Sequence, residues 1–220
     1  DAVRDFVGKA TPALKDDREP ARVERLRVLL AEAALLPAEL HLLPAINKPH
    51  DTLEALDALE QAGEVPPALK SRVLLARLAA LARSGSVLEM EGLLPDALAS
   101  DPAAAVTLQK LHDDLRAFAG CLPAPPQTDD ARMQSRMAAL LAKSLADWAR
   151  DRSDVSAADQ VVLRLQYGEA LLETGDYAAA REVFASCGGE AKIESGSGAA
   201  GHARARLGLA EAMYGLGDFA

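Results

Sequence analysis

Apolar residues three and four positions apart recur in almost every segment of this 220-residue chain, and proline, glycine or short polar clusters separate one segment from the next. This spacing places apolar side chains along one side of an α-helix. The segment that begins at Pro20 carries such a stripe in Val23, Leu26, Leu30 and Ala34. The pattern predicts an all-α fold in which short turns join consecutive helices into antiparallel hairpins.

The composition favours helices that pack through small side chains. Apolar residues make up 50% of the chain but aromatic residues only 4%, whereas β-rich cores rely on aromatic and β-branched residues. The net charge of -9 would repel a phosphate backbone, so we expect no nucleic-acid partner. The richest apolar stretch, residues 28–43, is interrupted by glutamates, a proline and a histidine, so we expect no membrane span.

The two cysteines leave the cellular compartment open. Cys121 and Cys187 are too few for a disulfide framework and lack CxxC spacing, so each is expected to be a small buried thiol. The chain opens at Asp1 without the basic and apolar regions of a signal peptide. The cytoplasm is the slightly preferred expectation over the periplasm, and the alanine-rich composition favours a bacterial origin.

A proline-rich stretch, CLPAPPQTDD at residues 121–130, marks the clearest break in the chain. Its prolines favour extended backbone, and the threonine or first aspartate is suited to cap a following helix. We therefore predict degenerate helical hairpins in residues 1–122 and a linker or long loop at 123–128. A long helix followed by helical repeats is expected in residues 129–220.

The clearest internal repeat, VVLRLQYGEALLETGDYAAAREVFASC, occupies residues 161–187. A large residue followed by a small one, Tyr167 and Gly168, lets a second helix approach closely, and Gly175 suits a left-handed turn. The arrangement resembles the tetratricopeptide repeat, a helical hairpin of about 34 residues. The resemblance implies that Phe184 is a packing residue of the second helix.

A second copy of the repeat begins at Ala203 and ends in a turn at Gly217. The intervening stretch, GGEAKIESGSGAAG, is expected to be a flexible linker. Upstream copies are degenerate: residues 71–102 fit one frame, and residues 51–67 fit the second half of another. The resemblance implies an α-solenoid of antiparallel helical hairpins, in which neighbouring hairpins share one continuous core.

The helix of the upstream half-copy at residues 51–67 has its own start signal. Asp51 and Thr52 are both residue types that cap helix N-termini, and they precede a stripe of apolar residues. We therefore expect this helix to begin just after them.

The resemblance also implies a binding surface, because tetratricopeptide proteins bind ligands on the concave face formed by the first helix of each repeat. The candidate contacts are Val162, Leu165, Gln166, Glu169, Leu172 and Glu173 in one copy, and Arg204, Leu207 and Glu211 in the next. Chaperone-binding members use Lys and Asn at such positions to hold a C-terminal carboxylate, whereas this chain has Gln and Glu. A protein or peptide partner with basic and apolar residues is therefore expected. The alternative is that these residues are solvent-exposed helix positions without a ligand.

No catalytic or metal-binding motif accompanies the repeats. The chain lacks HExxH, zinc-type Cys/His spacing, GxSxG and a P-loop. Asp113 and Asp114 are expected to point away from His112, because adjacent residues do not share a helix face. We expect no enzymatic activity, no cofactor and no metal.

The sequence thus predicts a protein–protein interaction scaffold. A competing hypothesis treats the chain as an oligomerising or sensory segment of a larger multidomain protein whose activity lies elsewhere. Leu209 and Met213 are expected to be exposed in the last, incomplete hairpin. Their exposure would favour a longer parent protein or a homo-oligomer formed through the C-terminal end.

Overall fold

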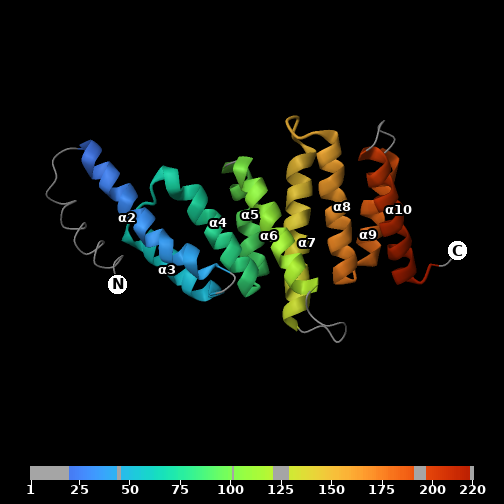
Figure 1. Ribbon diagram of the computed structural model, residues 1–220, viewed down its shortest axis with the longest axis horizontal. Helices are drawn as coiled ribbons and strands as arrows, with labels where there is room; N and C mark the ends of the chain where they lie inside the picture. The colour runs from blue at the N-terminus through green and yellow to red at the C-terminus, as the bar shows by residue number, and fades with distance from the viewer. Residues whose placement is uncertain (1–19, 44–45, 101, 121–128, 191–196, 219–220) are drawn as a thin grey trace. The chain divides into compact units, whose positions relative to one another are not determined.

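The chain folds into α-helices joined by short connections (Figure 1). The computed structural model describes residues 20–43, 46–100, 102–120, 129–190 and 197–218, and within these ranges it contains helices and turns but no strand. The helices are α2 (Pro20–His41), α3 (Pro49–Ala62), α4 (Pro67–Ser84), α5 (Val87–Ser100), α6 (Pro102–Gly120), α7 (Asp129–Arg150), α8 (Ala157–Thr174), α9 (Tyr177–Glu190) and α10 (Ser197–Leu216). The all-α prediction is confirmed.

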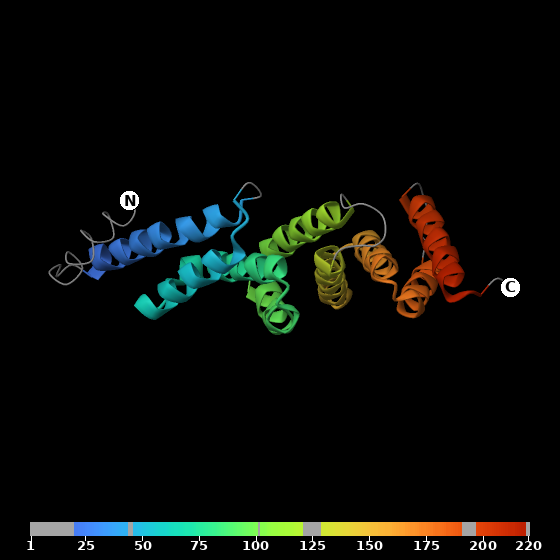
Figure 2. The same cartoon turned by 90° about the horizontal axis from the view of Figure 1, so that it is seen from below.

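The helices form two compact units, residues 1–104 and 105–220. In the first unit α2 packs on α3, α3 on α4 and α4 on α5; in the second, α7 packs on α8, α8 on α9 and α9 on α10. Alternate helices also meet, since α2 contacts α4 and α8 contacts α10 (Figure 2). The division between the units falls in the first turn of α6, after Ala104, whereas the predicted linker at 123–128 lies outside the described residues.

The core of the first unit is built from aliphatic side chains, chiefly leucine, valine and alanine, with Met90 of α5 also fully buried. Residues 20–104 contain no Phe, Tyr or Trp. The buried cluster that joins α2, α3 and α4 consists of Ala31, Leu35, Ala38, Leu56, Leu59, Leu69, Val73 and Ala76. The predicted stripe of Val23, Leu26, Leu30 and Ala34 is half-buried, and Ala34 packs against this cluster, whereas the fully buried side of α2 is formed by Ala31, Leu35 and Ala38.

A buried hydroxyl ties α3 to the end of α2. Thr52 Oγ1 donates to the carbonyl oxygen of Ala38 at 3.1 Å. That carbonyl belongs to the last turn of α2, where the N–H of Leu42 bonds to Glu39 instead, so it lacks its usual helical donor. The prediction that α3 begins just after Thr52 is wrong, because the helix begins at Pro49. Thr52 lies inside the helix and links it to α2.

Two predicted left-handed turns of the second unit are confirmed. Gly175 ends α8 with φ 80°, and its N–H bonds to the carbonyl oxygens of Leu171 and Leu172. Gly217, after α10, has φ 73°. At the start of α8 the Ser156 side chain accepts a hydrogen bond from the backbone N–H of Asp159 at 3.1 Å, so both ends of this helix are capped.

Glycines allow aromatic rings to pack between the helices of the second unit. The ring of Phe184, on α9, lies between Gly168 of α8 and Gly208 of α10, where a Cβ would come within 2.8 Å and 2.3 Å of ring atoms. Gly215 of α10 faces the ring of Tyr177 in the same way, with a Cβ at 2.5 Å. These contacts hold α10 against the α8–α9 hairpin, because only glycine leaves room for the rings.

Helical structure extends well into the predicted flexible linker. The helix α9 continues to Glu190, and α10 already begins at Ser197. The linker prediction is therefore wrong for both ends of this stretch, and residues 191–196 lie outside the described residues. The alanines between the glycines sustain the helix, and the glycine at 201 packs beside Leu165.

Candidate functional site: the α6, α8 and α10 face

Charged side chains connect α6, α8 and α10, three helices that alternate with α7 and α9 along the chain. Glu169 on α8 accepts hydrogen bonds from Arg204 on α10, at 2.6 Å to Nε and 2.8 Å to Nη2. The same carboxylate accepts one from Arg116 Nη1, on α6, at 3.3 Å. Arg116 Nε also donates to Glu173 at 3.0 Å. We call Arg116, Glu169, Glu173 and Arg204 the Arg–Glu ladder.

The Arg–Glu ladder is partly shielded from water. Burial opposes the positive charge of Arg116, but its hydrogen bond to Glu173 and the charges of Glu173 and Glu169 outweigh this, so the pKa of Arg116 is raised above its ordinary value. The paired arginines neutralise both glutamates. The ladder therefore presents balanced charges rather than an acidic surface.

His112 lies one turn before Arg116 on α6 and is buried. Its Nδ1 is 2.9 Å from Asp113 Oδ1, so the prediction that Asp113 points away from it is wrong. The carboxylate of an adjacent residue can reach the ring because the His side chain leans back along the helix. Burial, partly offset by Asp113, lowers the pKa of His112, which keeps the ring neutral at pH 7.

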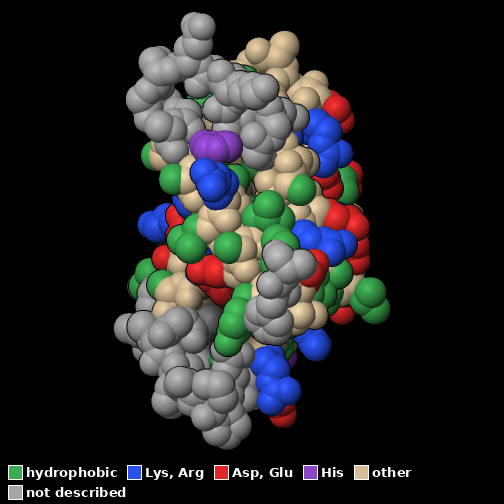
Figure 3. All heavy atoms as spheres, turned by 90° about the vertical axis from the view of Figure 1, so that its right-hand side faces the viewer, with side chains coloured by type: hydrophobic (Ala, Val, Ile, Leu, Met, Phe, Trp, Pro, Cys, Tyr) green, Lys and Arg blue, Asp and Glu red, His purple; other side chains and the backbone are tan. Residues whose placement is uncertain are grey.

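An open groove of about 420 Å³ lies next to the ladder, at the C-terminal ends of α8 and α10. Its lining is Leu172, Tyr177, Ala210, Glu211, Tyr214 and Gly215. Tyr214 is 74% exposed, and Leu207, one turn from Ala210, is 60% exposed. Figure 3, which faces the side of the molecule where α10 lies, shows hydrophobic side chains interspersed with charged ones. The groove is thus mainly apolar, with Glu211 as its charged group.

The structure places eight of the nine predicted contact residues at least partly on the surface of α8 and α10. Exposed positions are Val162, Glu173, Arg204, Leu207 and Glu211, and half-buried positions are Gln166, Glu169 and Leu172. Leu165 is fully buried, so its assignment as a ligand contact is wrong: it packs in the core near Gly201 of α10. Leu209 and Met213, expected to be exposed, are half-buried.

The sequence reasoning missed Arg116, Tyr177 and Tyr214 as members of this face. Arg116 lies 57 positions before Glu173, beyond any single repeat, so repeat spacing alone does not reveal the pair. Tyr214 had a usable signal, because Arg204, Leu207, Glu211 and Tyr214 follow helical three-and-four spacing.

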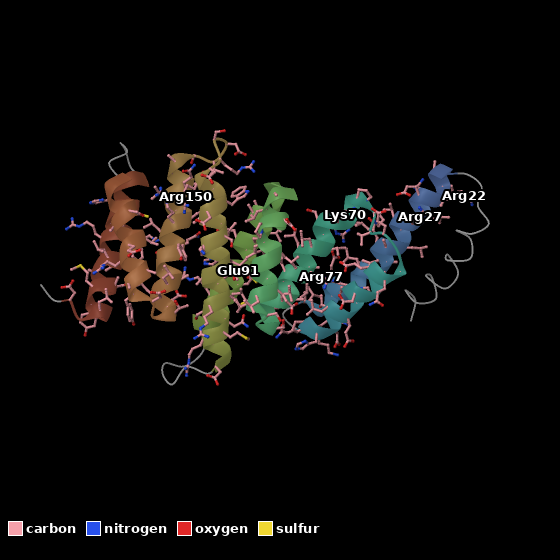
Figure 4. The ribbon with its side chains drawn as sticks, turned by 180° about the vertical axis from the view of Figure 1, so that it is seen from behind. Arg22, Arg27, Lys70, Arg77, Glu91 and Arg150 are labelled. Carbon is pink, nitrogen blue, oxygen red and sulfur yellow. The ribbon has the colours of Figure 1, made fainter. Side chains whose placement is uncertain are left out.

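The first unit also has an arginine–glutamate pair between alternate helices and an open groove, but its groove contains more charged side chains. Arg72 of α4 binds Glu39 of α2 through Nη2 at 2.8 Å. A groove of about 490 Å³ lies among α3, α4 and α5, and it is lined by Glu60, Gly63, Val65, Lys70, Val73, Leu74, Arg77 and Leu93. Arg77 pairs with Glu60, and Lys70 pairs with Glu64; both cations lie on α4 (Figure 4). By contrast, no ion pair reaches Glu211 within the described ranges.

The described part of the chain holds no cluster of three His, Cys, Asp or Glu side chains able to bind a metal ion. Over the same residues, no helix combines the length and the apolar character needed to cross a bilayer. No protein-family model and no curated protein matches the sequence at a significant level.

Proposed function

We propose that this protein is a helical-repeat scaffold, an α-solenoid with tetratricopeptide-like hairpins, that binds a peptide or helix of a partner protein. The observation that carries the proposal is the shared face of α8 and α10. These alternate helices contact each other and together line an open, mainly apolar groove. Stacked hairpins with such a shared face are the usual basis of ligand binding in helical repeat proteins.

The chemistry of the face narrows the expected partner. Glu169 and Glu173 are held by Arg116 and Arg204, so a basic ligand would have to displace an arginine to reach them. Apolar side chains of the partner fit the groove beside Leu172 and Tyr214, where burial of apolar surface supplies affinity. A Lys or Arg next to that apolar anchor would pair with Glu211.

Exposed residues of α10 allow a test that leaves the ladder intact. A photo-crosslinking amino acid at position 203, on exposed Ala203, should capture a partner protein in the cell of origin. Leu207→Glu and Glu211→Lys should each reduce capture at least about tenfold, because the first puts a charge in the apolar contact and the second reverses the charge. Neither residue belongs to the core, so the circular-dichroism melting curve should be unchanged.

The matched control is Leu88→Glu, which alters a leucine in α5 that is 83% exposed and belongs to the first unit. This variant should be captured as well as the unmodified chain. Equal capture by all variants would contradict binding at the α8–α10 face, and loss of capture by Leu88→Glu alone would move the binding surface to the first unit.

A further inference from the structure

The helix α2 carries large apolar side chains on a second face, away from the core of the first unit. Four leucines of this face each leave between 42% and 51% of their surface exposed. The face, which we call the leucine stripe, consists of Leu29, Ala33, Leu36, Leu40 and, just after the helix, Leu43. The buried residues of α2, such as Leu35 and Ala38, lie about half a helical turn away. A helix that is apolar on both sides is typical of one covered on both sides.

The spacing of the leucine stripe points to a helix as its occupant. Its residues are separated by four, three, four and three positions, which is the repeat of a coiled-coil seam. In such a seam each apolar side chain fits between side chains of a second helix with the same spacing. The α2 helix of another copy of this chain has that spacing by definition.

We propose that two copies of the chain associate through their leucine stripes, with the two α2 helices antiparallel about a two-fold axis. This arrangement places Leu29 of one copy against Leu40 of the other, and Ala33 against Leu36. The small Ala33 leaves room for the larger Leu36, so the surface is complementary to itself, as a two-fold interface requires.

Charges along the edge of the stripe are compatible with this association. Glu32 and Glu39 flank the stripe on one side, and the antiparallel arrangement brings them near the same residues of the other copy. Arg72 of the same chain lies 2.8 Å from Glu39 and 4.0 Å from Glu32, so it compensates one of these two negative charges. The pairing therefore reduces the repulsion between two acidic edges but does not remove it.

The expected dimer is reversible. One helix per copy makes an interface at the low end of the specific range, below about 1,200 Å² in total, so dimer and monomer should exchange with concentration. The leucine stripe belongs to the first unit and the proposed ligand groove to the second. Association through α2 therefore uses none of the residues of the α8–α10 face, and the two proposals fail independently.

Sedimentation of the full chain over a wide concentration range tests the dimer. The unmodified chain should shift from monomer to dimer, and Leu36→Glu with Leu40→Glu should raise the Kd more than about tenfold, because four unpaired charges would enter the seam. Leu88→Glu, the same type of substitution at an exposed leucine outside the stripe, should dimerise normally. A chain that stays monomeric throughout, or a dimer that survives the double substitution, would overturn the proposal.

Disulfide trapping tests the antiparallel geometry in a Cys121→Ser background. A copy with Leu29→Cys should crosslink efficiently to a copy with Leu40→Cys and poorly to another Leu29→Cys copy. Strong self-crosslinking of Leu29→Cys would refute the antiparallel arrangement. A chain that dimerises only after residues 1–19 are deleted would show that its own segment covers the stripe, which also overturns the proposal.

Discussion

The two units of this protein build the same kind of helix packing from different side chains. In each, an arginine binds a glutamate on the helix two places away: Arg72 to Glu39 in the first unit, Arg204 to Glu169 in the second. The first unit fills the core among α2, α3 and α4 with leucine, valine and alanine, and residues 20–104 lack aromatic side chains. The second unit instead inserts Phe184 between two glycines.

The difference shows that hairpin stacking needs close helix approach but not one particular way to achieve it. Alanine-rich surfaces let helices approach without large neighbours, and the first unit then secures its register with the buried bond from Thr52. Glycine paired with an aromatic ring achieves a close approach together with a large buried side chain. Only the second arrangement carries a sequence signature that can be recognised.

The largest expected effect comes from removing the ring that the second unit depends on. Phe184→Ala should lower the free energy of unfolding of that unit by about 3–5 kcal/mol, since it empties a fully buried site. Trp148, the single tryptophan, lies in the second unit and reports its unfolding by fluorescence. Leu56→Ala, in the first-unit core, should leave the Trp148 transition in place. Equal shifts from both substitutions would show that the units unfold as one.

A smaller effect is expected when the space for the ring is filled. Gly208→Ala should destabilise the second unit by about 1–3 kcal/mol, because its Cβ would meet the Phe184 ring. Gly201→Ala, on the same helix, should stabilise it by about 0.5–1 kcal/mol, since the nearest side-chain atom there is 3.9 Å away. Urea denaturation followed at Trp148 measures both. Stabilisation by both alanines would rule out tight ring–glycine packing.

In the first unit, the corresponding test removes a hydroxyl. Thr52→Val keeps the side-chain volume but leaves the Ala38 carbonyl without its donor, so the first unit should lose about 1–2 kcal/mol. Circular dichroism should show the loss, while Trp148 fluorescence, which reports the second unit, should not. Thr52→Ser keeps the hydroxyl and serves as the control. If Thr52→Val and Thr52→Ser cost the same, the hydrogen bond does not hold α2 to α3.

The smallest effects should come from the arginine–glutamate pairs that the two units share. Double-mutant cycles of Arg72 with Glu39 and of Arg204 with Glu169 should each give a coupling energy of about 0.2–1 kcal/mol, because these side chains remain in contact with water. Raising the salt concentration should reduce both couplings. A coupling energy well above this range in one unit alone would mean that the two arginine–glutamate pairs are not equivalent.

Helix positions followed from the sequence because they depend on local spacing and on turn residues. Gly175 and Gly217 occupy the left-handed turns that the sequence predicted, since few other residues tolerate that backbone. The stripe named in α2 contains only half-buried residues, because this helix is apolar on more than one side and spacing cannot tell which side meets the core. The start of α10 was assigned to the predicted linker because of its glycines, but the helix propensity of the neighbouring alanines outweighs theirs once the helix is docked.

The candidate site was predicted less well than the helices. Most of the chosen residues do lie on the surface of α8 and α10, because helical spacing fixes which positions share a side. Glu169 and Glu173 were expected to attract a basic partner. Their charges are instead paired with Arg116, which lies on a helix far away in sequence. Leu165 was misplaced because α10, whose Gly201 lies beside it, cannot be positioned from one repeat alone.

The glycines of α10 have a thermodynamic consequence beyond the room they provide. Gly201, Gly208 and Gly215 recur every seven residues, and three glycines lower the intrinsic helicity of a segment by about 2–3 kcal/mol relative to alanine. A helix so weakened does not persist by itself in water. Formation of α10 and its docking on the α8–α9 hairpin are therefore a single event, so the groove that it helps to line exists only while the helix is docked.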